Sequence, residues 1–124
     1  MGENDGYVIG VGAPIVYSGD PSTILNIAIL AEGYKLEEQE KFNLDAQHLV
    51  DYLFSIPTYR KYHYSFNVYP VNIASLDSGA ADPTACGGSG LKPRTYLDAS
   101  YCNGGIRRGM SFNNTLAANA VKKM

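Results

Sequence analysis

The sequence predicts an α/β fold, built on a strand–helix–strand (βαβ) unit with a partly parallel sheet. Three observations support it. Residues 24–30 form an almost continuous apolar run rich in β-branched residues, which is typical of a strand covered on both faces. Residues 36–54 carry apolar side chains at helical spacing, and residues 66–73 have the composition of a second strand. Because a helix connects the two strands, we expect them to be parallel.

The helix expected over residues 36–54 has one apolar stripe. Acidic residues crowd its first turns, where the helix dipole favours negative charge, and Pro57 follows its last turn. His48 falls on the opposite side, so we interpret it as a solvent-exposed residue rather than a metal ligand. We expect the stripe to pack on the sheet through Phe42, Leu49, Val50 and Leu53.

The remaining segments are less regular. Residues 1–23 are rich in glycine and proline and are interpreted as a lead-in that forms a short edge strand, a hairpin or an ordered approach. In the strand at 66–73, Pro70 cannot donate a ladder hydrogen bond, so we expect that strand at an edge, or bulged at this point. Residues 75–93 indicate a long loop, and residues 96–101 a short strand. A final helix over Thr115–Lys123 is expected, capped by Asn113 or Asn114.

Composition limits the classes of function. The chain has 124 residues, a length that fits one domain or part of one. Its net charge of -2 gives it no general attraction to phosphate backbones. The aromatic and basic mixture at 58–69 could serve as a platform for single-stranded nucleic acid, but three basic side chains in an acidic protein favour a structural connection instead. We therefore expect no nucleic-acid partner. No apolar stretch is long enough to span a membrane, and residues 1–10 lack the features of a signal peptide.

The usual catalytic signatures are missing from this sequence. It has no H-E-x-x-H helix, no G-x-S-x-G elbow and no phosphate-binding loop, so we assign no catalytic or metal-ligating residue. The glycine-rich stretch at 86–90 is interpreted as a surface loop. Cys86 and Cys102 either form one disulfide, which would close that loop region, or remain free thiols, and the sequence leaves both open.

Several motifs between residues 24 and 114 nevertheless resemble one known family. They are Asn26–Tyr34 (N-I-A-I-L-A-E-G-Y), Glu38-Gln39, Lys41-Phe42, Asp45-Ala46, Leu53-Phe54, Pro57, Tyr62, Phe66–Tyr69 (F-N-V-Y), Ser78–Ala80, Asp82-Pro83, Tyr96–Asp98, Gly104–Arg107 and Asn113-Asn114. In this order they are similar to the opening of the catalytic domain in the IgA peptidase family of zinc metallopeptidases. The sequence departs from the family pattern at Lys35, where a helix-capping threonine is usual, and at Pro70, where a small apolar residue is usual.

The resemblance implies a metzincin-like upper half of a metallopeptidase catalytic domain, with residues 1–23 as the lead-in and 24–124 as the domain's N-terminal part. It implies a zinc endopeptidase acting on proteins or glycoproteins, secreted or in the cell envelope. The zinc ligands and the catalytic glutamate are then expected downstream, so this chain alone should hold no zinc and be inactive. The alternative is a non-catalytic α/β binding or scaffold module.

Overall fold

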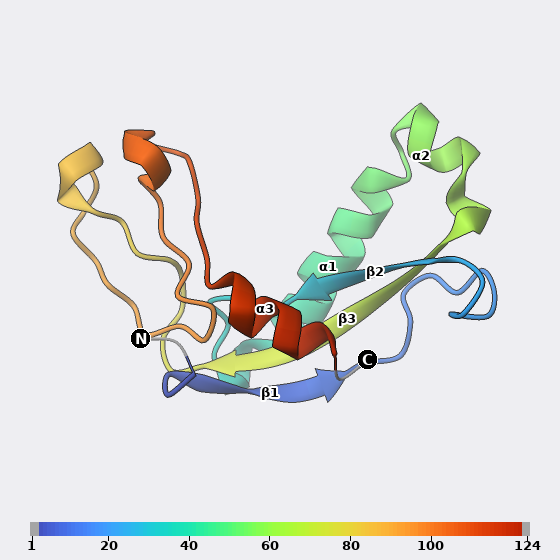
Figure 1. The fold of residues 1–124 in the computed structure, drawn as a ribbon, viewed down its shortest axis with the longest axis horizontal. Coiled ribbons are helices and arrows are strands. Elements are labelled where there is room, and N and C mark those ends of the chain that lie inside the picture. The colour runs from blue at the N-terminus through green and yellow to red at the C-terminus, as the bar shows by residue number, and fades with distance from the viewer. Residues whose placement is uncertain (1–2, 123–124) are drawn as a thin grey trace.

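A three-stranded mixed sheet organises the computed structural model, which describes residues 3–122 (Figure 1). Its strands are β1 (Gly6–Val11), β2 (Leu25–Leu30) and β3 (Phe66–Ser75), in the order β1-β3-β2. β3 pairs in parallel with β2 and antiparallel with β1. The predicted parallel pair and the mixed α/β class are therefore confirmed.

Helices lie on both faces of this sheet (Figure 1). A 3₁₀ turn, η1 (Leu36–Glu38), leads into α1 (Gln39–Leu53), and α3 (Asn114–Val121) follows much later in the chain. Asn72 of β3 donates a hydrogen bond to Gln39 at 2.9 Å, which places α1 on the face to which Asn72 points. Successive strand residues point to opposite faces, so Val71 and Ile73 lie on the α3 side, where Ala120 joins the same core cluster.

Four short helical turns lie in the connections between these elements. α2 (Pro57–Lys61) and η2 (His63–Ser65) connect α1 to β3. η3 (Thr84–Cys86) and η4 (Asn103–Gly105) lie in the loops between β3 and α3. These loops form an arm at the opposite end of the molecule from α2 (Figure 1).

The lead-in segment contributes an edge strand, which was one of its expected forms. β1 pairs with the C-terminal half of β3, and its register shifts between Val8 and Gly10. Asn67, fully buried in β3, then fixes the chain that follows β1. Its side-chain oxygen accepts hydrogen bonds from the Ser18 and Gly19 amides, and its amide group donates to the Gly19 carbonyl and to Asn26.

The strand at 66–73 was expected at an edge or bulged at Pro70. The edge placement was wrong, because β3 is the central strand, and the register shift lies between Val8 and Gly10 of β1 rather than at Pro70. Pro70 is tolerated there for a local reason. The Pro70 carbonyl accepts a hydrogen bond from the Gly12 amide, and the nitrogen and carbonyl of one strand residue point to the same side. The missing N–H of Pro70 therefore faces the segment after β1. There the chain leaves the regular ladder after Gly12, before Val16 bridges to Val68.

The predicted helix packing was correct in part. Phe42 and Val50 are buried, with 2% and 3% of their surface exposed, and Leu53 is half-buried. Leu49 was wrongly placed in the core, since 52% of its surface is exposed. The buried stripe runs through Phe42, Ala46 and Val50, at intervals of four residues. Leu49 is rotated about 100° from Val50 around the helix axis and lies beside the β2 edge of the sheet.

The segment after β3 also differs from its prediction at one point. Residues 96–101 form a turn with isolated bridges rather than a strand, because Asp98 adopts a left-handed backbone conformation (φ 53°) that interrupts an extended run. The final helix is confirmed, and the Asn113 side chain accepts a hydrogen bond from the Leu116 amide at 3.0 Å. Lys123, its expected last residue, lies outside the described residues.

Alanine substitutions at one buried and one exposed position of α1 should differ in their effect on stability. We expect Phe42→Ala to lower the free energy of unfolding by about 3 to 5 kcal/mol, because it removes a buried ring from the core. Leu49→Ala should change it by less than about 1 kcal/mol, since an exposed side chain loses little packing. Urea denaturation measures both. Equal losses at the two positions would contradict the observed orientation of α1.

Candidate functional site

The C-terminal end of β2 is held by a single carboxylate. Glu32 lies two residues after the end of β2, and its Oε1 accepts hydrogen bonds from the amides of Gly33 and Leu97, both at 3.1 Å. Its Oε2 accepts from the Thr95 hydroxyl at 2.9 Å and from the Ala99 amide at 2.7 Å. Glu32 thus connects the end of the parallel pair to a loop more than 60 residues later.

The backbone of residues 95–99 is shaped to meet this carboxylate. Asp98 has a positive φ and its amide donates to the Thr95 carbonyl, which closes a turn with the Leu97 and Ala99 amides directed at Glu32. Thr95 is fully buried, and the Tyr96 amide donates to the Ser75 hydroxyl at 3.1 Å. The loop is therefore attached both to Glu32 and to the end of β3.

A carboxylate has about four lone-pair positions, and all four are used here by protein donors. A general base or a metal ligand needs at least one of them for a substrate proton or a cation. Glu32 is therefore a structural anchor, and the geometry gives it no catalytic role.

An apolar hollow of about 420 Å³ lies beside this anchor. Met110 and Phe112, on its rim, have 47% and 51% of their surface exposed. A hollow with so few polar groups favours apolar side chains over charged or sugar-like ligands. Its lining residues are Leu30, Glu32, Leu97, Ala99, Met110, Ser111 and Phe112.

The Gly33-Tyr34 motif fixes α1 to the same end of β2. The Tyr34 hydroxyl donates a 2.7 Å hydrogen bond to Asp45, which also forms an ion pair with Lys41 at 2.6 Å. Burial, together with the Asp45 carboxylate, raises the pKa of Tyr34 to about 12, so the hydroxyl stays protonated as a donor. Gly33 has a positive φ, and a Cβ there would collide with the Gly79 backbone, so glycine is required.

The start of α1 explains how Lys35 is accommodated. The Lys35 amide donates to the Glu38 carboxylate at 2.9 Å, and Ser78 donates to the same oxygen. These hydrogen bonds, the Ser78 bond foremost, lower the pKa of Glu38. Glu38 thus supplies the reverse half of a capping box without a threonine at position 35. Glu38 therefore acts as a capping residue at the start of the helical segment.

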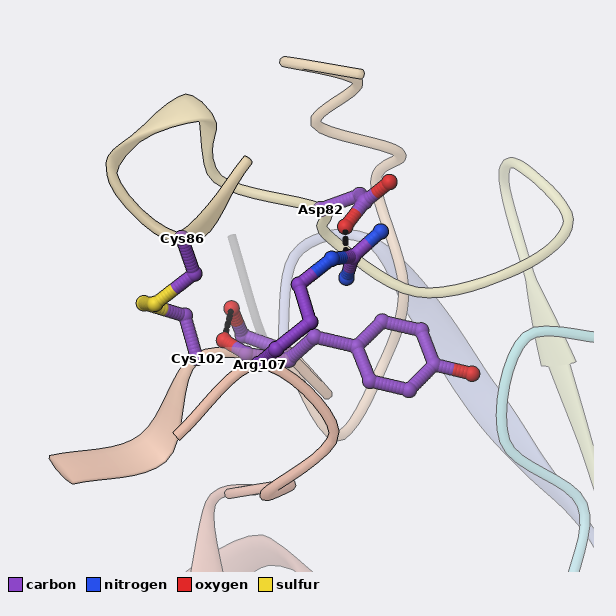
Figure 2. The surroundings of a disulfide bond; sticks show 6 residues. Asp82, Cys86, Cys102 and Arg107 are labelled. Carbon is purple, nitrogen blue, oxygen red and sulfur yellow. Dashed lines mark hydrogen bonds and ion pairs between the residues drawn. A yellow bond between two sulfur atoms is a disulfide. The ribbon is translucent and has the colours of Figure 1, made fainter. Parts of the chain in front are cut away.

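The long loops after β3 carry the two cysteines (Figure 2). Cys86, in η3, is joined to Cys102, next to η4, with 5.8 Å between their Cα atoms. Ser100 bridges Ala81 on one side and Ser111 on the other, so the two loops also share backbone contacts. The cysteines therefore tie together segments that already lie side by side.

Asp82 is a second tie between these loops (Figure 2). Its Oδ1 pairs with Arg107 at 2.7 Å, and its Oδ2 accepts a hydrogen bond from the Ser89 amide at 2.9 Å. The Ser89 amide, with a further contribution from Arg107, lowers the pKa of Asp82. A Cβ on Gly88 would collide with Asp82, so this tight loop depends on glycine.

A third ion pair attaches the loop to the end of β3. Arg94 donates to both carboxylate oxygens of Asp77, at 2.9 and 3.2 Å, and its backbone amide adds a bond of 2.8 Å. These donors, chiefly the Arg94 side chain, lower the pKa of Asp77 to about 2. The pair is a structural contact between the loop and the end of β3.

The two histidines lie away from this region. His48 is exposed on α1, and His63 lies in η2, where its Nδ1 is 2.7 Å from the Arg60 carbonyl. Within residues 3–122, no three His, Cys, Asp or Glu side chains gather in a way that could hold a metal ion. No described helix is long and apolar enough to cross a membrane.

Comparison with known families identifies the family of this chain, which the geometry alone does not. The model of the family described as IgA Peptidase M64 matches residues 13–124. The chain belongs to this family. The match includes β2, α1, β3 and both cysteine loops, and the suspected resemblance is thereby confirmed. The IgA peptidase M64 family is zinc-dependent, and as a peptidase family it implies a protein substrate. No curated protein matches the chain.

The structure shows a role for several residues of the family motifs that the sequence analysis did not identify. Asn26, Glu32, Tyr34 and Asn67, which carried the resemblance, are all hydrogen-bonding residues of the β2–β3 framework. The only available signal for Glu32 was an acidic residue placed just after an apolar run that predicts a strand. Its contacts with Thr95, Leu97 and Ala99 could not be predicted from the sequence, because these residues lie far along the chain.

We predict that the bond between Cys86 and Cys102 also forms in the protein in solution. Non-reducing peptide mapping of material purified without reductant should recover the two cysteines in one linked fragment. Because they are 16 residues apart, replacing both with serine should lower the free energy of unfolding by about 3 kcal/mol. Recovery of both as alkylated thiols would contradict the prediction.

Proposed function

We propose that this chain is the N-terminal part of the catalytic domain of a secreted zinc metalloendopeptidase, which hydrolyses peptide bonds in proteins or glycoproteins. The observation that carries the proposal is the IgA peptidase M64 match over residues 13–124. The β2–α1–β3 unit and the Glu32 anchor then form the framework on which the rest of the domain is built. The arrangement implied by the resemblance is the upper half of a metzincin-like domain.

The described residues do not fit a catalytic zinc ion. Such a site uses three protein ligands around one metal and leaves a position open for water. His48 is exposed on α1, and the Glu32 carboxylate is fully used by protein donors. We therefore assign the zinc ligands and the water-activating glutamate to sequence that follows Met124, and derive no catalytic step for the chain itself.

The division into a lead-in at 1–23 and a domain at 24–124 is part of the proposal. The family match begins at residue 13, and β1 pairs with β3, so the lead-in packs as a structural part of the sheet. The bonded cysteines agree with an oxidising, extracellular location. A protein substrate follows from the family, and the glycoprotein class remains part of the proposal.

A comparison of two forms of the protein tests this function. We expect a form extended through the next predicted helix to bind one zinc ion and to show proteolysis that chelators abolish, and the 124-residue chain to do neither. Metal analysis and a casein digestion assay measure both. His48→Ala in the extended form is the matched control and should leave both properties unchanged, because this histidine is exposed and isolated.

Two results would contradict the proposal. Stoichiometric zinc together with chelator-sensitive proteolysis in the 124-residue chain would place the active site within it. An extended reading frame without zinc-ligand residues would instead favour the non-catalytic binding or scaffold module.

A further inference from the structure

A polar hollow of about 410 Å³ lies between α1 and the segment that follows β1. It is lined by Pro70 of β3, by residues 12–15 and by three carboxamide side chains, those of Asn43, Gln47 and Asn72. Asn43 and Gln47 belong to α1, and Asn72 belongs to β3. None of the described residues that line the hollow is charged. The hollow therefore suits an uncharged polar ligand.

The hollow lies where Pro70 interrupts the ladder between β3 and the segment after β1. Opposite residues of an antiparallel pair exchange two backbone hydrogen bonds. The Gly12 amide donates to the Pro70 carbonyl at 2.9 Å, but Pro70 has no N–H to donate in return. The next amide of this segment to reach β3 is that of Ile15, which donates to the Val68 carbonyl at 2.8 Å. Within the described chain, the Gly12 carbonyl and the Ala13 amide thus have no backbone partner on β3.

The three carboxamides are only partly used by the protein. The Asn72 Nδ2 donates to Gln39 and to the Asn43 Oδ1, at 2.9 and 3.1 Å. The Gln47 Nε2 donates to Asp51 at 2.9 Å. The Asn43 Nδ2, the Asn72 Oδ1 and the Gln47 Oε1 have no hydrogen-bond partner within residues 3–122. The side chains that line the hollow therefore have both unused donors and unused acceptors.

This combination of groups matches the hydroxyls of a neutral sugar. A hydroxyl both donates and accepts, so the N–H and C=O groups of one carboxamide can bind two neighbouring hydroxyls. The Pro14 and Pro70 rings add apolar surface, which suits the C–H groups of a sugar ring. A phosphate or a carboxylate would find no cation among the lining residues. An extended peptide would need an open strand edge, and residues 12–16 already cover this part of β3.

We propose that this hollow binds a neutral sugar unit of a glycan through the carboxamides of Asn43, Gln47 and Asn72. The inference goes beyond the proposed function and does not rest on it, because sugar binding needs neither zinc nor proteolysis. In a peptidase, such a site would hold a glycoprotein substrate by its glycan rather than by its peptide chain.

Saturation-transfer NMR on the full-length parent protein tests the site, with lactose, N-acetyllactosamine and mannobiose as the neutral probes. We expect at least one of them to bind, and Asn43→Ala and Gln47→Ala each to weaken its binding about tenfold, because each removes hydrogen bonds to the sugar. Gln47 is exposed, so its variant should keep the wild-type melting temperature. Asn103→Ala removes an exposed carboxamide in η4, and this matched control should bind as the wild type does.

Several results would overturn the inference. The first is that none of the three sugars binds, and the second is that wild type and Gln47→Ala bind them equally. Tighter binding of sialyllactose than of lactose would indicate an anion site instead, and tighter binding of a blocked alanine tripeptide would indicate peptide recognition.

Proteolysis is measured separately from sugar binding, so the two proposals fail separately. A parent protein that binds sugar in this hollow but shows no zinc-dependent proteolysis would contradict only the proposed function. An active zinc peptidase that binds none of the sugars would contradict only the present inference.

Discussion

The Glu32 carboxylate is the interaction on which the arrangement of the second half of the chain depends. This carboxylate lies just beyond the end of β2 and accepts its hydrogen bonds from Gly33 and from residues 95–99. The Leu97 carbonyl in turn accepts a 2.7 Å hydrogen bond from the amide of Asn113, the cap of α3. Leu97 also packs with Leu116 and Ala117 of that helix. One charged group thus links the parallel pair to the helix that covers the opposite face of the sheet. Hydrogen bonds to an ionised group are worth more than neutral ones, and four backbone or hydroxyl donors would lose their partner without it.

The core of the fold could be predicted because it follows from local pattern. A buried strand, an amphipathic helix and a second strand each have their own periodicity, and the connection between them requires parallel pairing. The errors concern features that depend on neighbours in space. Leu49 belongs to the apolar stripe by spacing, but three strands are too few to cover it. Pro70 suggested an edge strand, but the segment after β1 leaves the regular ladder beside the proline, so no strand needs its missing N–H.

The site could be predicted less well, for a physical reason. Three of the four donors to Glu32 lie 63 to 67 residues later in the chain, and a turn with a left-handed Asp98 is needed to present them. Neither relation leaves a periodic signal in the sequence. The same holds for Asp77 with Arg94 and Asp82 with Arg107, each of which joins distant segments. The resemblance to a peptidase family could be recognised, since motif order survives in sequence where three-dimensional contacts do not.

Amide exchange at Leu97 and Ala99 tests the central role of Glu32 most directly. Glu32→Gln keeps the size of the side chain but replaces one acceptor with a donor that faces backbone N–H groups. We expect both amides to exchange about tenfold faster or more in this variant than in the wild type, which corresponds to the loss of one charge-assisted hydrogen bond. Glu37→Gln, at an exposed position in η1, should leave them unchanged. Unchanged exchange at Leu97 and Ala99 in Glu32→Gln would show that the loop is held by other contacts and would contradict this account.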